Sequence, residues 1–317
     1  MARVLVSDQL SKDGLAILEK AEGIELDNRP GLSEEELAKA IVGADGLVIR
    51  SGSKVTARVL EAADKLEVIG RAGIGVDNVD IPAATKKGIL VMNTPTANSV
   101  TTAEHAIGLM FALSRKVPAA DASMKAGKWE KKKFAGREIS GKTLGIIGIG
   151  TIGSIVAVRA NGLKMNILAY DPVVSEEHAV ELGAKLVPLD ELFAKSDIIT
   201  IHTPLNEHTK HIVNDAAIEK MKDGVMLVNA ARGGVYEEAA VLRGLESGKI
   251  AGAAFDVYTE EPPGATELVK HPNVVATPHL GASTKEAQNR VSTEIAHQVV
   301  AFLTEGSVVN AVNKPAK

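Results

Sequence analysis

Cysteine is absent from the 317-residue sequence. Without cysteine the chain can form no disulfide framework, no thiolate nucleophile and no cysteine-based zinc site, and this fits a reducing compartment. The sequence also lacks any run of 18 apolar residues. Its first residues, Met1 to Asp8, read as a short strand rather than as a charged segment followed by a long apolar core. We therefore expect no signal peptide and no membrane span, and we expect the protein to be cytoplasmic.

A strong charge of either sign is lacking as well. The chain has 36 Lys and Arg residues against 40 Asp and Glu residues, which leaves a formal net charge of −4. Such a balance gives no overall field that draws a protein to nucleic acid or to an anionic membrane. Internal repeats do not stand out, and the GxSxG motif of many hydrolases does not occur. We expect a small-molecule partner, and neither a nucleic-acid nor a membrane partner.

The composition itself is ordinary for a globular protein, with 45% hydrophobic and 24% charged residues. A chain of this length exceeds one ordinary core and suits two domains of roughly 100 to 200 residues each. In its first part, short β-branched runs alternate with helical stretches, which predicts a parallel sheet. Ser33 and Glu36 are spaced as a capping box and predict that a helix begins there. Strands are expected at residues 4–6, 47–49, 68–69 and 89–92.

The second part of the chain repeats this alternation. One long apolar helix is expected over residues 97–118, and the charged loop after it, residues 125–141, holds the only tryptophan, Trp129. Six strands with helices between them follow, which predicts a doubly wound α/β sheet. These strands are expected at residues 144–147, 167–170, 198–201, 226–229, 251–255 and 274–276. The tail is expected to be helical over 285–303, and residues 308–310 to form a last strand that returns to the first domain.

A glycine-rich turn joins the first strand and the first helix of this second part. Gly148, Gly150 and Gly153 match GxGxxG, in which the first glycine makes a tight turn, the second lets a pyrophosphate approach and the third packs helix on strand. The motif alone is weak evidence, but here a predicted strand leads into it and a predicted helix leaves it. The next strand ends at Asp171, which can accept both ribose hydroxyls and repel a 2′-phosphate. The sequence therefore predicts NAD, rather than NADP, as the cofactor.

A second phosphate-binding pattern also occurs. Residues 136–143 fit the P-loop expression GxxxxGK followed by Ser or Thr. A working P-loop follows a strand and opens a helix, whereas here a charged loop precedes the match and a strand follows it, so the amides would not converge on a phosphate. We therefore predict that this segment binds no triphosphate.

Three ionisable side chains follow the predicted carboxyl ends of strands, where ligands of an open parallel sheet lie. Arg232 presents a planar fork that can hold a carboxylate and polarise a neighbouring carbonyl. His279 can take a hydroxyl proton as a hydride leaves, and return it in the reverse reaction. Glu261 can hydrogen-bond His279 and fix its tautomer, but Glu260 is a rival that position alone cannot separate. The pattern predicts hydride transfer coupled to proton transfer.

Two other histidines, His208 and His211, are spaced like metal ligands. No acidic or histidine third ligand is evident near them, and a zinc site needs at least three protein ligands. We therefore interpret this stretch as a polar loop and expect no metal.

The sequence resembles the D-isomer-specific 2-hydroxy acid dehydrogenases over essentially the whole chain. The resemblance lies in residues 70–78, 92–95, 127–130, 229–234, 256–263 and 278–284. It implies that Arg232, Glu261 and His279 are catalytic, with the glutamate directly before the proline in the role left open above. Together with the glycine motif, it implies that NAD is contacted by Gly148, Gly150, Thr151, Ile152, Gly153, Asp171, Thr203, Ala230, Ala231, Arg232, Asp256, His279, Leu280, Gly281 and Ala282.

The resemblance also implies how the chain is divided. A Rossmann-type nucleotide-binding domain, residues 97–285, would be inserted into a discontinuous, flavodoxin-like substrate-binding domain of residues 1–96 and 286–317. It further implies a homodimer, with the helix from Ser99 and the Trp129 loop at the contact. Longer members of the family continue into domains that sense serine, so we expect no feedback by serine here.

The expected substrate is a phosphorylated 2-hydroxy acid, whose phosphate needs cations from the smaller domain. For the lysines at 131–133 and for Arg50, a solvated basic face is the alternative interpretation. The candidate substrate contacts are Arg50, Ser51, Arg71, Gly73, Lys131, Arg232 and His279.

Two other functions fit the same residues. The nearer one is a reductase of the same family that acts on glyoxylate or hydroxypyruvate, with similar catalytic residues and no phosphate site. The other is an NAD-sensing binding protein, similar to transcriptional co-repressors that share this fold and bind peptide motifs. The arginines available for a phosphate and the lack of a peptide-tail extension favour an enzyme. Kinetics with phosphorylated and unphosphorylated substrates would separate the first two.

Overall fold

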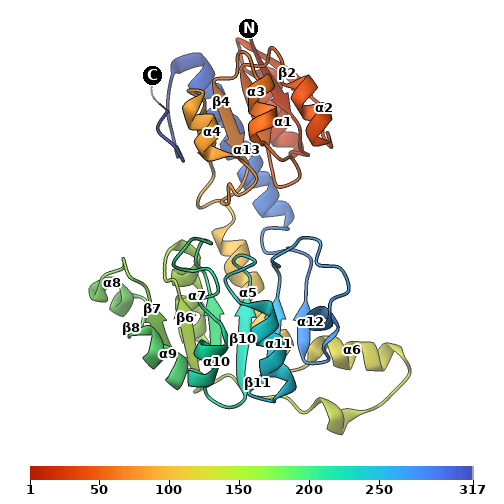
Figure 1. Cartoon of the computed structure of the whole chain (residues 1–317), viewed down its shortest axis with the longest axis vertical. Helices are drawn as coiled ribbons and strands as arrows, with labels where there is room; N and C mark the ends of the chain where they lie inside the picture. The colour runs from red at the N-terminus through yellow and green to blue at the C-terminus, as the bar shows by residue number, and fades with distance from the viewer. Residues whose placement is uncertain (316–317) are drawn as a thin grey trace. The chain divides into compact units, whose positions relative to one another are not determined.

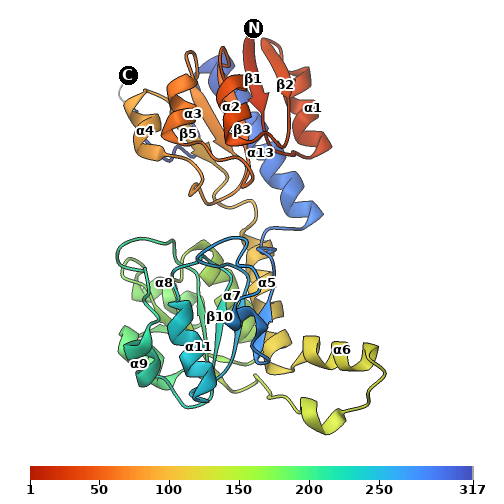
Figure 2. The same ribbon diagram turned by 45° about the vertical axis from the view of Figure 1, so that its right-hand side comes forward.

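The computed structural model describes residues 1–315, which gather into two compact units. Unit 1 contains residues 1–98 together with the described residues from 283 on, and unit 2 contains Ser99–Ala282. Both units are drawn from two sides in Figures 1 and 2. Over residues 1–315, no helix combines the length and the apolar character needed to cross a bilayer.

Unit 1 is built on a five-stranded parallel sheet in the order β2-β1-β3-β4-β5. Its strands are β1 (Ala2–Val6), β2 (Ile24–Asn28), β3 (Gly46–Ile49), β4 (Val68–Arg71) and β5 (Leu90–Asn93). Its helices are α1 (Lys12–Lys20), α2 (Glu34–Ala40), α3 (Ala57–Ala62), α4 (Ile81–Lys86) and α13 (Lys285–Glu305). This is the flavodoxin-like strand order, so the predicted fold class of the unit is confirmed.

Successive strand residues feed two apolar cores, one on each face of this sheet, because side chains alternate along a strand. Leu47 belongs to the core that α2 helps to form, whereas its neighbour Val48 packs with residues of α13. Gly70 lies against α13, since a Cβ there would meet Val299 Cγ2 at 2.6 Å. The glycine thus lets the helix approach the sheet closely.

The predicted start of α2 is confirmed, whereas the pattern does not predict β2. Ser33 N donates to Glu36 Oε2 at 2.9 Å, and Glu36 N donates to Ser33 Oγ at 3.3 Å, which completes the capping box. The residues of β2 read Ile-Glu-Leu-Asp-Asn and form an edge strand. An edge strand with this many polar residues gives only a weak hydrophobic signal.

The chain continues in unit 1 after α13, but residues 308–310 do not form the expected strand. The pairing lies just beyond them, where Ala311 forms an antiparallel bridge with Met92. Val91 N donates to Asn313 Oδ1 at 2.8 Å, and Asn313 Nδ2 donates to Ile89 O at 3.0 Å. A side-chain amide thus replaces part of the ladder that a regular strand would form on β5.

Unit 2 is built on a seven-stranded parallel sheet in the order β12-β11-β10-β9-β6-β7-β8. Its strands are β6 (Thr143–Ile147), β7 (Asn166–Tyr170), β8 (Ala184–Leu186), β9 (Ile198–Ile201), β10 (Val225–Asn229), β11 (Ile250–Phe255) and β12 (Val274–Ala276). Its helices are α5 (Ser99–Ser114), α6 (Val117–Lys125), α7 (Thr151–Gly162), α8 (Glu176–Glu181), α9 (Leu189–Lys195), α10 (Asp215–Lys220), α11 (Glu238–Glu246) and α12 (Glu267–Lys270). Read from β8, this is the dinucleotide-binding order with one strand added, as the sequence predicted.

The single helix expected over residues 97–118 is wrong, because the structure has two helices there. α5 ends at Ser114, and Lys116 adopts a left-handed conformation with φ 53° before α6 begins. Pro118 stands in the first turn of α6, where a missing N–H costs no helical hydrogen bond. The apolar pattern runs through this break, so periodicity alone does not reveal it. Seven strands form in place of six, because the short β8 reads Ala-Lys-Leu and lacks the β-branched residues that mark the equally short β12, Val-Val-Ala.

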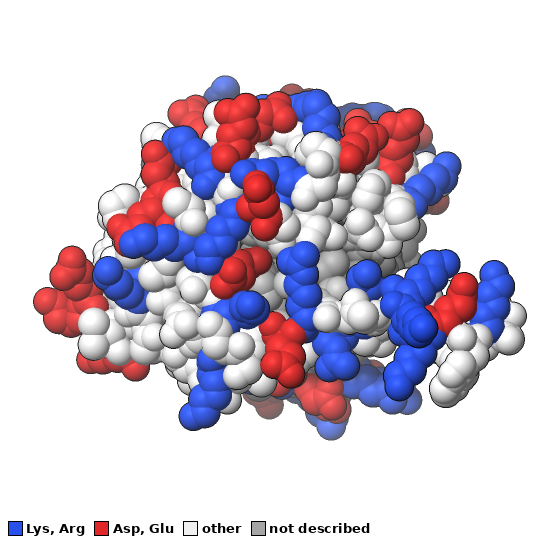
Figure 3. All heavy atoms as spheres, turned by 90° about the horizontal axis from the view of Figure 1, so that it is seen from below, with Lys and Arg blue, Asp and Glu red and all other residues white. Residues whose placement is uncertain are grey.

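After α5 the chain leaves the body of unit 2. We call residues 117–134, which contain α6 and the short 3₁₀ helix η1 (Lys131–Phe134), the arm. Figures 1 and 2 both show the arm extending away from the sheet of unit 2. Trp129 in the arm is 80% exposed. In Figure 3 basic side chains gather over the arm, while the two charge signs are interspersed elsewhere on this face.

Candidate active site at the carboxyl edge of the seven-stranded sheet

The turn between β6 and α7 has the shape that a phosphate-binding turn needs. Gly148 has a positive φ of 87°, and a Cβ on it would meet Thr203 Cγ2 at 2.6 Å. A Cβ on Gly153 would collide with the carbonyl oxygen of Gly148, so only glycine allows the helix to lie so close to the turn. By contrast, nothing lies within 4 Å of the position of a Cβ on Gly150. The turn is therefore tight on its inner side and open at the amino end of α7.

This opening suits a pyrophosphate. α7 has 12 residues, and the first N–H groups of any helix lack acceptors within the helix. Ser154 Oγ donates to Ile149 O at 2.7 Å and braces the turn. The hydroxyl of Thr203 is buried beside the turn and has no hydrogen-bond partner among the described residues. These donors fit the phosphates of a dinucleotide, which the sequence predicted here.

Asp171 follows β7 and is tied to the same turn. Its Oδ2 accepts a hydrogen bond from Ile149 N at 3.0 Å, and its Oδ1 accepts from Val173 N at 2.9 Å and Val174 N at 3.2 Å. The carboxylate thus holds the glycine turn as well as its own loop. Oδ2 accepts one hydrogen bond here and has a second lone pair, so it can accept a further hydrogen bond from a ligand.

Arg232 lies on the loop that follows β10, and Asn229 shapes this loop. The buried Asn229 accepts from Ala231 N at 3.1 Å and donates to Arg232 O at 2.9 Å. Arg232 Nη1 donates to Ala231 O at 2.6 Å. A Cβ on Gly233 would overlap the carbonyl oxygen of Tyr258, so the loop can press against the neighbouring loop only with glycine there. The side-chain amide therefore fixes the backbone on which the guanidinium stands.

His279 and Glu261 meet although 18 residues separate them in the chain. His279 Nδ1 and Glu261 Oε2 lie 2.7 Å apart, and Tyr258 N donates to Glu261 Oε1 at 3.1 Å. The carboxylate thereby places the proton on Nδ1 and leaves Nε2 for another partner. Glu261, rather than its rival Glu260, makes this contact. The side chain of His279 is 47% exposed and that of Glu261 is 38% exposed, so a ligand can reach the pair.

Behind His279 lies a buried carboxylate that the sequence singled out as a cofactor contact. Asp256 accepts from Leu280 N at 2.7 Å, from Gly281 N at 2.8 Å and from Thr277 Oγ1 at 2.6 Å. His105 Nε2, on α5, lies 3.1 Å from Asp256 Oδ1. Burial raises the pKa of Asp256, but the hydrogen bonds from His105, Thr277 and Leu280 outweigh it and hold the pKa below its usual value.

The sequence missed His105. Its signal in the sequence was a single histidine on a mostly apolar helix. This signal is weak, because such a histidine has many structural uses.

His202, at the end of β9, is also part of this edge. Its Nε2 lies 3.0 Å from Thr200 Oγ1, and burial lowers its pKa to about 4, so it is neutral near neutral pH.

The other residues expected to contact a substrate lie in two places. Arg50 with Ser51, and Arg71 with Gly73, stand at the carboxyl ends of the neighbouring strands β3 and β4 in unit 1. Arg50 Nη1 donates to Gln9 O at 3.2 Å, and Arg71 Nη1 donates to Ala72 O at 3.3 Å. Lys131 lies on the arm of unit 2. The arm extends away from the sheet of unit 2 in Figures 1 and 2.

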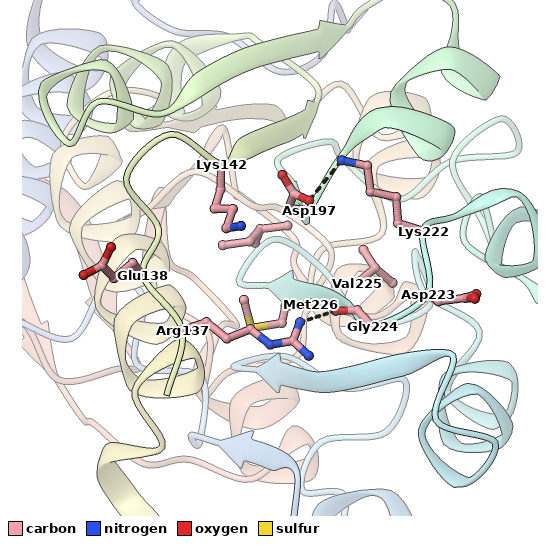
Figure 4. A pocket seen from close by; sticks show the side chains of 10 residues that line it. Arg137, Glu138, Lys142, Asp197, Lys222, Asp223, Gly224, Val225 and Met226 are labelled. Atoms are coloured by element: carbon pink, nitrogen blue, oxygen red, sulfur yellow. Dashed lines mark hydrogen bonds and ion pairs between the residues drawn. The ribbon is translucent and has the colours of Figure 1, made fainter. Parts of the chain in front are cut away.

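A pocket of about 210 Å³ at the opposite edge of this sheet, where β6, β9 and β10 begin, is not part of the site. Figure 4 shows Lys222 turned toward Asp197 and Arg137 turned toward Gly224, whereas Glu138 and Asp223 point away from them. Arg137 Nη1 donates to Gly224 O at 2.6 Å, and Lys222 Nζ donates to Asp197 Oδ1 at 2.9 Å. Lys142, at the end of the rejected P-loop pattern, lines this pocket just before β6, and no helix follows it. The structural context of the pattern is thus not that of a P-loop.

Comparison with known proteins identifies the kind of domain that carries this edge. Residues 107–281 match the model of the D-isomer specific 2-hydroxyacid dehydrogenase, NAD binding domain. The chain is 50% identical over 316 residues to D-3-phosphoglycerate dehydrogenase of Pongo abelii, and 50% identical over 315 residues to that of Archaeoglobus fulgidus. It spans 59% and 60% of the length of these relatives, and they cover 100% and 99% of it.

A solved structure agrees with these matches. The cofactor (NAD⁺) bound 3-phosphoglycerate dehydrogenase of Entamoeba histolytica superposes with a TM-score of 0.83 at 31% identity. The match covers 99% of each chain. The similarity therefore extends over both units of the described chain.

Proposed function

Since the chain belongs to the D-isomer-specific 2-hydroxyacid dehydrogenase family, we propose that it oxidises 3-phospho-D-glycerate to 3-phosphooxypyruvate with NAD, the first step of serine biosynthesis. The observation that carries the proposal is the contact of 2.7 Å between His279 Nδ1 and Glu261 Oε2 at the edge that also carries Arg232. Family membership makes the chain an NAD-dependent oxidoreductase. The choice of substrate rests on the two curated relatives and on the arginines of unit 1.

In this proposal His279 is the acid-base residue. NAD, when bound, supplies the acceptor of the hydride that leaves C2 of the substrate together with its bonding electrons. His279 Nε2 takes the proton of the C2 hydroxyl, so that the C2–O bond becomes a carbonyl. The carboxylate of Glu261 stabilises the imidazolium that forms. In the reverse direction the same proton returns to the hydroxyl.

Arg232 binds the substrate carboxylate and polarises the carbonyl that forms next to it. Support comes from the loop around it, which Asn229 holds through hydrogen bonds of 2.9 and 3.1 Å. A planar guanidinium on a fixed backbone can bind a carboxylate through two parallel hydrogen bonds. These bonds hold the substrate carboxylate and also orient the neighbouring C2.

For the cofactor we assign the pyrophosphate to the amino end of α7 and the adenosine ribose to Asp171. The open position at Gly150 and the unpartnered hydroxyl of Thr203 support the first assignment. The remaining lone pair of Asp171 Oδ2 supports the second, and the negative charge of the carboxylate disfavours the 2′-phosphate of NADP. The remaining proposed contacts are Gly148, Thr151, Ile152, Gly153, Ala230, Ala231, Arg232, Asp256, His279, Leu280, Gly281 and Ala282.

The phosphate of the substrate is assigned to Arg50, Ser51, Arg71 and Gly73. Asn78 Nδ2 donates to Arg50 O at 2.6 Å and to Ser53 O at 2.7 Å, which holds the Arg50 loop in a defined shape. A hypothetical Cβ on Gly73 would overlap the guanidinium of Arg71, so glycine is required for that side chain to lie where it does. Lys131 lies away from the edge that carries His279, so the proposal rests on the arginines.

We also propose that the protein is a homodimer in the cytoplasm, with no nucleic-acid or membrane partner. The support is a set of large apolar side chains exposed on α5 and the arm, namely Phe111, Val117, Met124 and Trp129. A second copy of the chain would remove this surface from water. Light scattering of the purified protein should give twice the chain mass of 33.2 kDa. A monomer mass at micromolar concentration would contradict the dimer.

A substrate panel followed by NADH absorbance tests the activity. We expect the highest kcat/KM with 3-phospho-D-glycerate, and an Arg50→Ala variant should raise KM for this substrate about tenfold while leaving KM for D-glycerate nearly unchanged. Arg58→Ala is the matched control, because Arg58 is an exposed arginine of unit 1 that pairs with Glu35 at 3.3 Å. Faster turnover of glyoxylate or hydroxypyruvate would assign the chain to the reductases. NADH binding without any turnover would favour a binding protein.

A further inference from the structure

His105 is a polar group that the proposed reaction does not use. It stands on α5, and its side chain is 22% exposed. Its Nε2 lies 3.1 Å from Asp256 Oδ1 and 3.2 Å from Thr277 Oγ1. Neither partner belongs to the groups that transfer the hydride or the proton.

Hydrogen-bond chemistry fixes the direction of these contacts. The hydroxyl of Thr277 has one proton, and it donates this proton to Asp256 Oδ1 at 2.6 Å. Toward His105 that hydroxyl can therefore only accept, and the carboxylate of Asp256 can only accept as well. Nε2 of His105 must then carry a proton and share it between these two oxygens.

Asp256 directly follows β11, and the loop 277–281, which carries His279, is folded around its carboxylate. Its carboxylate accepts from Leu280 N and Gly281 N, and its carbonyl oxygen accepts from His279 N at 2.8 Å. His279 itself adopts a left-handed conformation with φ 54°, which a residue with a Cβ rarely keeps without support. The hydrogen bonds to Asp256 supply that support on both sides of the histidine.

The donors to this buried carboxylate differ in where they come from. Thr277, Leu280 and Gly281 all belong to the loop itself, so they move with it. His105 contacts the carboxylate from outside the loop, since it stands on a helix of the unit's core. A carboxylate that is 1% exposed needs its donors, because water cannot replace them.

We infer that His105 is a positioning residue: through Asp256 it holds the loop 277–281 in the conformation that keeps His279 against Glu261. The inference rests on the proposed function only for its kinetic readout. His105 thus affects the rate of proton transfer without touching the substrate. Without the N–H of His105, the loop 277–281 is less well held, and His279 leaves its left-handed conformation more often.

The test uses two substitutions in the full chain and one control. His105→Leu removes the donor, whereas His105→Gln keeps an N–H near the position of Nε2. His178→Leu is the control, since His178 is also a histidine of unit 2 beside a carboxylate, with Nδ1 3.6 Å from Glu181 Oε2. We expect kcat of His105→Leu to fall about tenfold, with KM for NAD changed less than about threefold. We expect His105→Gln to recover most of the loss, and His178→Leu to behave as the native protein.

A second measurement does not depend on the substrate. In proton NMR the Nδ1 proton of His279 should give a downfield signal because of its hydrogen bond to Glu261, and His279→Ala identifies that signal by its loss. In His105→Leu this signal should broaden or disappear, while His105→Gln should keep it. If it persists unchanged in His105→Leu, the inference is wrong even where the enzyme turns over no phosphoglycerate. If kcat and NADH affinity fall together in both His105 variants, His105 serves general stability and the positioning role is likewise wrong.

Discussion

At the scale of single residues, the proposed reaction assigns a role to one of two adjacent glutamates. Only Glu261 contacts His279, through Oε2 at 2.7 Å, and its other oxygen accepts from Tyr258 N at 3.1 Å. The sequence left Glu260 and Glu261 as alternatives until the family resemblance favoured the second. The geometry gives a physical reason for that choice, because an imidazole held at Nδ1 presents Nε2 in a fixed direction.

Glu261→Gln should therefore lower kcat by about a hundredfold, because a neutral amide no longer stabilises the imidazolium. The same change at Glu260 is the matched control, and we expect it to alter kcat less than about twofold. Steady-state rates of NADH formation at saturating NAD measure both. Equal losses in the two variants would contradict the assignment of Glu261.

His202 should make the free energy of unfolding depend on pH in the acid range. Burial lowers its pKa to about 4, against 6.5 for an ordinary histidine, so the native state favours the neutral ring. Because the pKa in the folded state is depressed, this contribution is present above about pH 6.5 and is lost as the pH falls from 6.5 toward 4. The native protein should lose stability over this window relative to a variant without the ring.

We expect the free energy of unfolding of the native protein, relative to His202→Gln, to fall by up to about 1.4 kcal/mol per pH unit in that window. Urea unfolding at several pH values measures the difference. His208→Gln is the control, since His208 is exposed in the adjoining loop. A pH dependence shared equally by the native protein and His202→Gln would show that His202 is not the group responsible.

At the scale of elements, the turn between β6 and α7 is the proposed pyrophosphate site. Gly148→Ala should weaken NADH binding by at least about tenfold, because alanine is strained at φ 87° and its Cβ would meet Thr203. Gly162→Ala lies at the other end of α7, where a Cβ meets nothing within 4 Å, and should leave NADH affinity unchanged. Fluorescence titration with NADH compares the two. Unchanged affinity in Gly148→Ala would exclude this turn as the pyrophosphate site.

The elements that the sequence predicted are those with a strong local signal. β6 and α7 carry a motif in which each glycine has a steric task, and α2 begins at a complete capping box. The features that the sequence did not predict also have local causes. The break after Ser114 depends on one left-handed residue inside an apolar stretch, and β8 is a short strand without β-branched residues. Neither feature changes the hydrophobic period of the sequence, so periodicity does not detect them.

The candidate site was predictable in part for a related reason. Three ionisable residues follow predicted strand ends, so the sequence identifies them as candidates: Arg232, Glu261 and His279. The network behind them was not predictable, because His105 and Asp256 are 151 positions apart and meet only through the packing of α5 on the sheet. Long-range polar contacts of this kind leave no periodic signal.

At the scale of the whole molecule, two parallel-sheet units divide the proposed tasks. Unit 2 carries the cofactor turn, the acid-base pair and Arg232, and unit 1 carries the arginines assigned to the phosphate. In both units the candidate residues lie at the carboxyl ends of parallel strands: Arg71 is the last residue of β4, and Arg232 follows β10. The same rule of sheet architecture thus explains both sets.

The most direct test of the central claim is the rate of NADH formation from 3-phospho-D-glycerate by the native chain and by His279→Ala, with NADH affinity measured in parallel. The account predicts steady turnover by the native chain, and a loss of at least about a hundredfold in His279→Ala with NADH binding retained. Comparable turnover by both proteins would contradict it.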